Sequence, residues 1–116
     1  MFVESAPIAA ALTVTAAVIR FSRSVAGALA HEDRRMANRL AVVVAKIGSN
    51  AVDISEFLRG AKRARTRKMK DELLGMALKR TELTLLLVRD LVRMLDLIWY
   101  RPTLMTKIVR RLKRRH

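Results

Sequence analysis

The stretch from Leu74 to Trp99 decides the fold. It reads LGMALKRTELTLLLVRDLVRMLDLIW, and its apolar residues recur at alternating steps of four and three. Such spacing places them along one side of a helix that packs against neighbours. The seam consists of Leu74, Leu78, Thr81, Leu85, Val88, Val92, Leu95 and Trp99, and a second stripe of Leu83, Leu87, Leu91, Met94 and Ile98. We therefore predict a long helix, about residues 67–100, that contacts neighbours on two sides.

Three more helices are predicted, at about residues 7–29, 32–59 and 102–114. Only 4 glycines and 2 prolines interrupt the chain, and no strand-like alternation of polar and apolar residues occurs. Proline is tolerated in a first helical turn, which suits Pro7 and Pro102, whereas Gly60 is expected to end the second helix. The sequence therefore predicts an all-α single domain over residues 1–116. Its four helices form a bundle-like arrangement with a long third helix and a basic amphipathic C-terminal helix.

The second predicted helix carries a seam of its own. This seam consists of Met36, Leu40, Val43, Ile47, Ala51, Ile54 and Leu58. Its spacing is typical of helices that pack in bundles or coiled coils. Gly48 lies in the same helix and is expected to allow a close helix crossing.

The first predicted helix is apolar on all sides in its first half. The run from Ala6 to Ile19 holds 14 residues before Arg20 interrupts it, fewer than the ~20 needed to span a bilayer. A helix that is apolar all round is usually surrounded by protein. Hydrophobic residues also make up 52% of the chain, more than a small monomer readily buries. We therefore expect a homo-oligomer that self-associates through the first and third helices.

The start of the chain and its lack of cysteine bear on localisation. Met1 to Glu4 carries no positive charge of the kind that opens a secretion signal. The absence of cysteine removes disulfides and thiolate metal sites, and it fits a reducing compartment. We expect a protein that is not secreted by a signal peptide and is cytoplasmic or held within a nucleoprotein particle.

The net charge of +14 is concentrated in two clusters. The loop cluster lies between the second and third helices and consists of Lys62, Arg63, Arg65, Arg67, Lys68 and Lys70. The C-terminal cluster consists of Arg101, Lys107, Arg110, Arg111, Lys113, Arg114 and Arg115. An excess of this size repels itself unless an anionic partner offsets it. These residues are therefore the candidate nucleic-acid-binding residues.

Each cluster has a plainer alternative. The loop cluster can be a solvated loop, and the C-terminal helix can lie on a membrane surface or dock on a neighbouring subunit. For the loop cluster we favour contact with the phosphates of nucleic acid over a solvated loop. For the C-terminal helix, docking on a neighbouring subunit together with phosphate contact is our first choice and anionic membrane our second. If the C-terminal helix folds back along the third helix, the two clusters join into one groove for a polyanion.

The aromatic residues are few, and none falls within either cluster in the sequence. They are Phe2, Phe21, Phe57, Trp99 and Tyr100. Proteins that bind single strands usually stack the bases on aromatic side chains. We therefore expect contact with the backbone of a duplex, by shape and charge, and place Trp99 and Tyr100 in the core or at an interface.

No set of residues forms a recognisable catalytic or metal site. His31 has no second histidine at metal-ligand spacing, and the glycines are isolated rather than gathered in a phosphate-binding loop. Asp53 and Glu56 share a helix face without supporting residues, and Ser22 with His31 lacks an orienting group. We expect neither enzymatic activity nor a cofactor or metal.

Size, charge and helix number give the chain two architectural resemblances. It resembles the small basic four-helix proteins that assist reverse transcriptases in diversity-generating retroelements, and also the helical coat proteins of filamentous archaeal viruses. The leucine-rich stretch ELTLLLVRDLVRMLDL, residues 82–97, is of a kind that many bundles share. The expected function is a self-assembling nucleic-acid-binding protein that contacts phosphates without reading bases, as a coat, packaging or accessory factor. The alternatives are a peripheral membrane protein and a structural subunit that binds an acidic protein partner.

Overall fold

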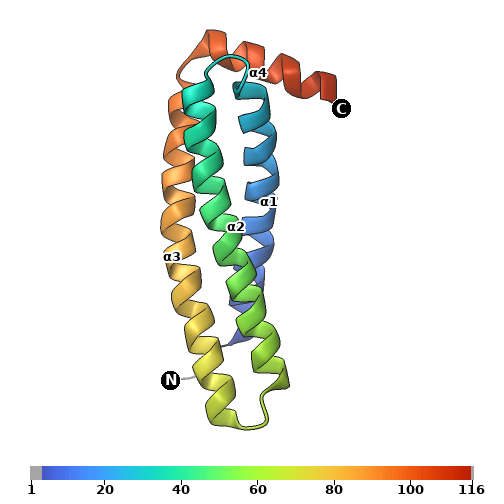
Figure 1. The fold of residues 1–116 in the computed structure, drawn as a ribbon, viewed down its shortest axis with the longest axis vertical. Helices are drawn as coiled ribbons and strands as arrows, with labels where there is room; N and C mark the ends of the chain where they lie inside the picture. The colour runs from blue at the N-terminus through green and yellow to red at the C-terminus, as the bar shows by residue number, and fades with distance from the viewer. Residues whose placement is uncertain (1–3, 116) are drawn as a thin grey trace.

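Four helices make up nearly all of the described chain (Figure 1). The computed structural model describes residues 4–115, so Phe2 and His116 lie outside it. The helices are α1 (Ser5–Leu29), α2 (Arg34–Arg63), α3 (Arg67–Trp99) and α4 (Pro102–Arg115). Helices α1, α2 and α3 lie side by side with alternating direction, and α4 crosses the end of the bundle where α3 finishes. The predicted all-α, bundle-like fold is confirmed, including the long third helix and the basic C-terminal helix.

Side-chain caps fix where α2 and α3 begin. Asp33 Oδ1 accepts a hydrogen bond from the backbone N–H of Met36 at 3.0 Å. Thr66 Oγ1 accepts one from the backbone N–H of Met69 at 3.2 Å. Each cap satisfies an N–H group that the first turn of a helix leaves without a partner. Because Asp33 is the cap, α2 begins at Arg34 rather than at Glu32 as predicted.

The predicted roles of two glycines in α2 are wrong. The helix continues past Gly60 to Arg63, and a Cβ atom at Gly60 would lie 3.2 Å from Leu73 Cδ1 of α3. At Gly48, where we expected a close crossing, nothing lies within 4 Å of the position of a Cβ atom. At Gly60, therefore, a side chain of α3 packs tightly against α2. A glycine's use depends on what faces it, and the facing helix is not visible in a local pattern.

The seam of α3 keeps the predicted alternation of three and four residues, but alternate positions are shifted by one residue. Leu74 and Thr81 of the predicted seam and Leu91 and Ile98 of the predicted second stripe are buried, and the other buried residues of α3 are Ala77 and Thr84. Leu85, Val92 and Trp99, which we placed in the seam, are exposed. The Thr84 hydroxyl donates a hydrogen bond to the Arg80 carbonyl oxygen at 2.7 Å, so burying this threonine leaves no unpaired hydroxyl. A pattern scored on apolar residues alone therefore selected Leu85 in place of Thr84.

The core is concentrated at the α4 end of the bundle. The larger group of buried apolar residues joins all four helices and includes Leu29, Leu40, Leu91 and Ile108. A smaller group lies elsewhere along the bundle and consists of Ile8, Ile54 and Ala77. In the predicted seam of α2, Leu40, Ile47 and Ile54 are buried, and the others, Met36, Val43, Ala51 and Leu58, are half-buried. The seam of α2 is therefore confirmed in position.

The bundle is narrow and elongated, with extents of 56 × 25 × 19 Å. The turn between α2 and α3 lies at one end, and α4 lies across the other (Figure 1). Because α4 packs against α1 and α3 at that far end, it does not run back along α3. The hypothesis that the two basic clusters join into one groove is therefore wrong for a single chain.

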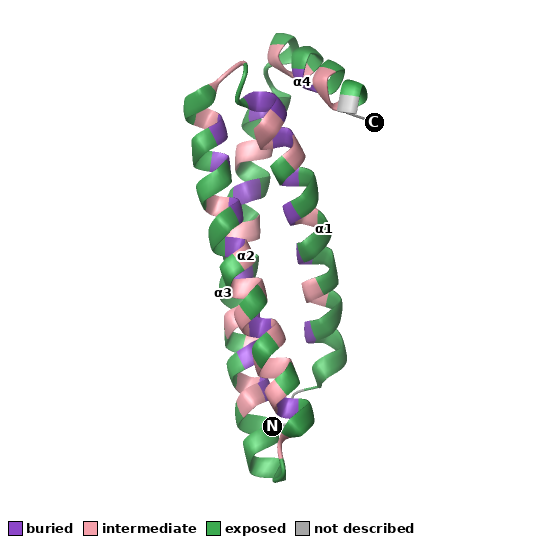
Figure 2. Ribbon diagram, turned by 45° about the vertical axis from the view of Figure 1, so that its right-hand side comes forward, coloured by how far each residue is buried: buried purple, intermediate pink, exposed green. Residues whose placement is uncertain are grey.

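Helix α1 is covered on one side only (Figure 2). Ile8, Ile19 and Val25 are buried, whereas Val14 and Phe21 are exposed. By length and composition alone α1 could cross a membrane, although the core helix of a soluble protein passes the same test. We expected that the other three helices would not enclose α1, and they do not. Part of its apolar surface is therefore exposed and free to contact a partner.

Candidate nucleic-acid interface

The loop cluster occupies the tip of the bundle. Lys62 and Arg63 lie in the last turn of α2, Arg65 lies in the connecting turn, and the remaining three basic residues lie in the first turns of α3. All six side chains are exposed. The antiparallel packing of α2 against α3 brings them together at one end of the molecule (Figure 1).

The local electrostatics of this tip favour an anion. The N-terminus of a helix carries a partial positive charge, which acidic side chains usually offset. The first turn of α3 contains no acidic residue and instead carries Arg67, Lys68 and Lys70. The positive end of the dipole and the basic side chains therefore reinforce one another, and a phosphate group placed there would relieve both.

Most of the loop cluster has no ion-pair partner among residues 4–115. In the part of the chain that the structure describes, Lys62, Arg63, Arg65, Lys68 and Lys70 form no ion pair. Arg67 is engaged within the chain. A groove of about 720 Å³ separates this turn from the start of α1, and its lining includes Arg65 and Lys70 but also the acidic residues Glu4 and Asp71. Because these two carboxylates lie in the groove, the side of the tip that faces away from the groove is the more strongly basic side.

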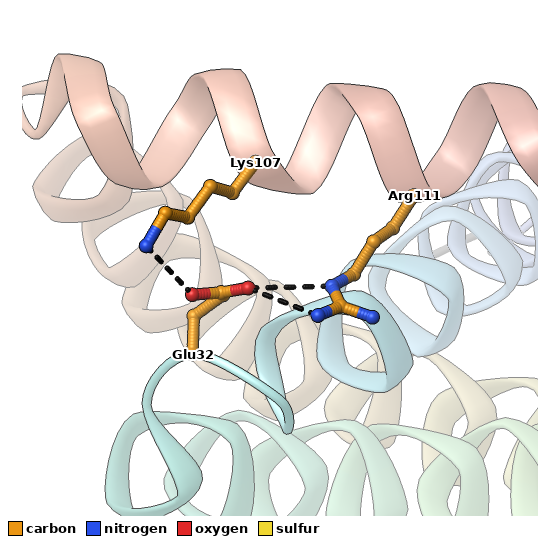
Figure 3. A network of polar contacts seen from close by, with 3 residues as sticks. All are labelled: Glu32, Lys107 and Arg111. Atoms are coloured by element: carbon orange, nitrogen blue, oxygen red, sulfur yellow. Dashed lines mark hydrogen bonds and ion pairs between the residues drawn. The ribbon is translucent and has the colours of Figure 1, made fainter.

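The C-terminal cluster is partly neutralised by Glu32 and Asp33, which lie in the turn between α1 and α2, and Figure 3 shows the contacts of Glu32. The carboxylate of Glu32 lies 3.3 Å from Lys107 Nζ and 3.1 Å from an Arg111 guanidinium nitrogen. Arg111 Nε also donates to the same carboxylate at 3.3 Å. Asp33 pairs with Arg101 at 3.3 Å. These contacts hold one flank of α4 against the bundle.

The pKa of Glu32 reports this pairing. Partial burial acts to raise the pKa of the carboxyl group, but hydrogen bonds from Arg111 and Lys107 and their positive charges act the other way. The net result is a pKa below the ordinary value. Glu32 is therefore held in its charged form, as an ion-paired anchor for α4.

Because of these ion pairs, fewer residues of the C-terminal cluster are free to bind a partner than the sequence indicated. Arg101, Lys107 and Arg111 are engaged by Glu32 and Asp33, whereas Arg110, Lys113 and Arg114 are exposed and form no ion pair among the described residues. The backbone of Arg115 ends α4, and its side chain lies outside the described part. The sequence pattern missed the pairing because Arg111 and Glu32 are 79 residues apart.

Trp99 and Tyr100 lie on the surface rather than in the core of the chain. Trp99 is 68% exposed and Tyr100 is 81% exposed. Trp99 lines a groove with Arg110 and Lys113 of α4. The placement of Trp99 in the core is therefore wrong, and an aromatic side chain does lie beside the C-terminal cluster in space.

The apolar side of α4 is turned toward the bundle. Ile108 is only 1% exposed, and Leu104, Met105 and Leu112 are partly buried against the same core. An amphipathic helix that lies on a membrane inserts this side into the lipid. In the single chain these side chains are already packed against the core, so they are not exposed for insertion into lipid.

A third basic region was missed by the sequence analysis. Arg34, Arg35 and Arg39 line a groove of about 780 Å³ between α2 and α3, together with apolar residues that include Met94 and Leu97. The three arginines lie within the first two turns of α2, so their spacing was visible in the sequence. Their place beside apolar residues of α3 was not.

The geometry defines an elongated all-α bundle with basic residues at both ends. Among residues 4–115, no three His, Asp or Glu side chains gather as a metal site would require. Comparison with protein-family models, with curated proteins and with solved structures finds no match to this chain.

Proposed function

We propose that this protein is a non-enzymatic, self-assembling nucleic-acid-binding protein that contacts the phosphate backbone without reading bases. In this role it serves as a coat, packaging or accessory factor. The loop cluster carries the proposal, because it places six exposed basic side chains at one end of a bundle. Five of the six form no ion pair among the described residues.

The physical support is electrostatic. A basic side chain that contacts a phosphate releases counterions from the nucleic acid, and this release drives sequence-independent binding. The N-terminus of α3 adds backbone N–H groups and a partial positive charge to the same tip. The tip therefore has the features of a phosphate contact and none that distinguishes one base from another.

The two basic ends suit a repeating assembly. One chain places its basic residues at both ends of a bundle whose longest extent is 56 Å. A single polyanion segment bound at the tip does not reach α4 unless it follows the length of the bundle. Neighbouring copies can instead bring a tip and an α4 end together along one strand or duplex.

Self-association is supported by the apolar surface that the single chain leaves exposed. Val14 and Phe21 are exposed seven residues apart on one face of α1, and Leu83 and Leu86 are exposed three residues apart on one face of α3. Contiguous exposed apolar patches usually indicate an interaction site. Sedimentation of the wild type and of a Phe21→Glu variant tests the proposal: the wild type forms oligomers and the variant shifts toward the monomer. Sedimentation of the wild type as a monomer at all concentrations would remove this part of the proposal.

The binding test compares two variants that lose the same charge at different places. The tip variant carries Arg65→Ala, Lys68→Ala and Lys70→Ala, and all three side chains are exposed. The control variant carries Arg20→Ala, Lys46→Ala and Lys79→Ala, which are exposed residues along the sides of the bundle. Binding of labelled duplex DNA is followed by fluorescence anisotropy over a range of salt concentrations.

The tip variant is expected to bind duplex DNA more weakly, and its affinity is expected to depend less on salt concentration. Both changes are expected to be much smaller in the control variant. Each phosphate contact contributes about 0.9 to the slope of log affinity against log salt, so three contacts contribute ~2.7. Equal losses in the two variants would mean that net charge alone attracts DNA, with no defined tip site. Absence of nucleic-acid binding by the wild type at low salt would refute the proposal as a whole.

A peripheral membrane protein is the second candidate, and α1 is the observation that favours it. Part of its apolar surface is exposed, and the helix is long and apolar enough to enter a bilayer. Flotation with vesicles of anionic lipid separates the two candidates. Flotation that Phe21→Glu abolishes, in a preparation that binds no DNA, would favour the membrane.

A further inference from the structure

The corner between α3 and α4 contains a groove that combines an exposed tryptophan with free basic side chains. Its volume is about 620 Å³, within the range of about 300–1,000 Å³ typical of small-ligand sites. The groove is lined by Trp99, Pro102, Met105, Thr106, Val109, Arg110 and Lys113. Its lining therefore offers an aromatic face, an apolar floor and two cations.

Helix α4 divides its basic residues between two flanks. On one flank Lys107 and Arg111 are paired with Glu32. Lys113 lies on the other flank, and Arg110 lies between the two, since it also borders a small pocket beside Glu32. Arg110 and Lys113 line the groove with Trp99 and form no ion pair among the described residues. The acidic partners are thus all used on the flank that faces the α1–α2 turn, and the groove keeps its positive charge.

The chemistry of the groove suits one unpaired nucleotide segment. A base can stack on the indole of Trp99, because every base has an aromatic face, and its flanking phosphates can contact Arg110 and Lys113. A duplex cannot use the indole in this way without unstacking a base, which costs free energy. Aromatic residues joined to a positively charged groove are the features by which proteins bind single strands without sequence preference.

A membrane surface fits the same groove less well. Membrane-binding residues project their apolar groups outward from a basic helix. Here the main apolar side of α4, with Ile108 at its centre, is packed against the bundle, and the remaining apolar atoms line a concave surface. The charge of the groove is complementary to phosphate, and its volume of about 620 Å³ is large enough for a small ligand.

We propose that this corner groove binds single-stranded nucleic acid, with one base stacked on Trp99 and its phosphates held by Arg110 and Lys113. The proposal rests on the proposed function of the chain and makes it more specific, because it assigns single strands to the α4 end. It also removes the reason for favouring a duplex there, since that expectation came from the absence of aromatic residues within the clusters in the sequence.

Trp99 is the only tryptophan of the chain, so its fluorescence reports on this groove alone. The test titrates the full chain with a short single-stranded oligothymidylate, with a duplex of the same length and with phosphatidylglycerol vesicles. We expect the oligothymidylate to quench the fluorescence of Trp99 and the duplex to leave it nearly unchanged. Anisotropy of the labelled oligonucleotides gives the affinities.

The variants separate stacking from charge and from folding. Trp99→Ala is expected to weaken oligothymidylate binding about tenfold without changing duplex binding, whereas Trp99→Phe keeps most of the affinity. Tyr100→Ala is the matched control, because this neighbouring aromatic residue is exposed and lies outside the groove lining. Arg110→Ala with Lys113→Ala is expected to lower the salt slope for single strands by ~1.4, at about 0.7 for each contact. Circular dichroism establishes that each variant is folded.

The outcomes distinguish this proposal from the proposed function. If the chain binds oligothymidylate but Trp99→Ala binds it as tightly as the wild type, the groove assignment is overturned and the phosphate-binding function stands. If no nucleic acid binds, both are overturned. A change in Trp99 fluorescence with vesicles alone identifies the corner as a membrane contact and likewise overturns the proposal.

Discussion

Ser22 is expected to destabilise the protein, so replacing it with alanine should raise stability. The side chain is fully buried in α1, at 0% exposed, and its Oγ atom has no hydrogen-bond partner. Among the described residues, it is the only buried side-chain nitrogen or oxygen atom without a hydrogen-bond partner. Burying a hydroxyl group without a partner costs about 1–3 kcal/mol.

The size of the gain follows from three contributions. Ser22→Ala removes the unpaired hydroxyl and adds the better helix propensity of alanine, about 0.5 kcal/mol. It also loses the few dispersion contacts of one oxygen atom, which offsets part of the gain. We expect a net stabilisation of about 1 kcal/mol, which corresponds to a rise in Tm of about 4 °C for a domain of this size.

Ser24→Ala in the same helix is the matched control. Ser24 is half-buried, and its hydroxyl donates a hydrogen bond to the Arg20 carbonyl oxygen at 3.2 Å. The control gains the same helix propensity but removes a hydroxyl group that is hydrogen-bonded within its own helix, so it shows what replacing a satisfied serine with alanine does in this helix. Thermal and urea unfolding at one protein concentration give both values. A Ser22→Ala variant that is no more stable than Ser24→Ala would refute the reasoning.

Three further predictions concern the helix packing and the docking of α4. Gly48→Ala is expected to stabilise the chain by about 1 kcal/mol in urea unfolding, because a Cβ atom there meets nothing within 4 Å. Gly60→Ala gains less or loses stability, because its Cβ atom would lie 3.2 Å from Leu73, and an equal gain in both would contradict the packing. Ile108→Ala should cost about 2–5 kcal/mol of α4 docking, seen as faster trypsin cleavage of α4 with little change in the unfolding of the other helices. Glu32 has a lowered pKa, so its contribution to docking is present above the ordinary value of 4.5 and is lost as the pH falls through the lower folded value. The protection factors of the α4 amides, which correct the exchange rates for the intrinsic effect of pH, should therefore fall on acidification below that value, and in Glu32→Gln they should be lower at neutral pH and vary less with pH.

The number, type and order of the helices could be predicted from the sequence because these properties are local. Apolar residues at helical spacing, few glycines and prolines, and capping residues such as Asp33 and Thr66 all act within one or two turns. The bounds were displaced by only a few residues, as at Arg34 and Arg63. The two basic clusters were equally visible, since charge is read directly from the residues.

The seam of α3 shows where the local pattern was insufficient. Leu85 and Thr84 are adjacent, and the more apolar residue was assigned to the core. Thr84 is nevertheless the buried one, because its hydroxyl is satisfied within its own helix and the facing surface accommodates it. Which of two neighbouring residues points inward depends on the rotation of the helix against its partners, and that rotation is set by the packing of the whole bundle.

The surroundings of α4 were decided by the tertiary structure alone. The turn after Trp99 sends α4 across the end of the bundle, where Glu32 meets a helix that lies 79 residues further along the chain. The same crossing places Trp99 beside Arg110 and Lys113. The sequence determined which residues are charged, aromatic or apolar, because those are properties of single side chains. Which charges are neutralised and which remain free depends on distances between segments far apart in the chain, and only the arrangement of the helices determines these.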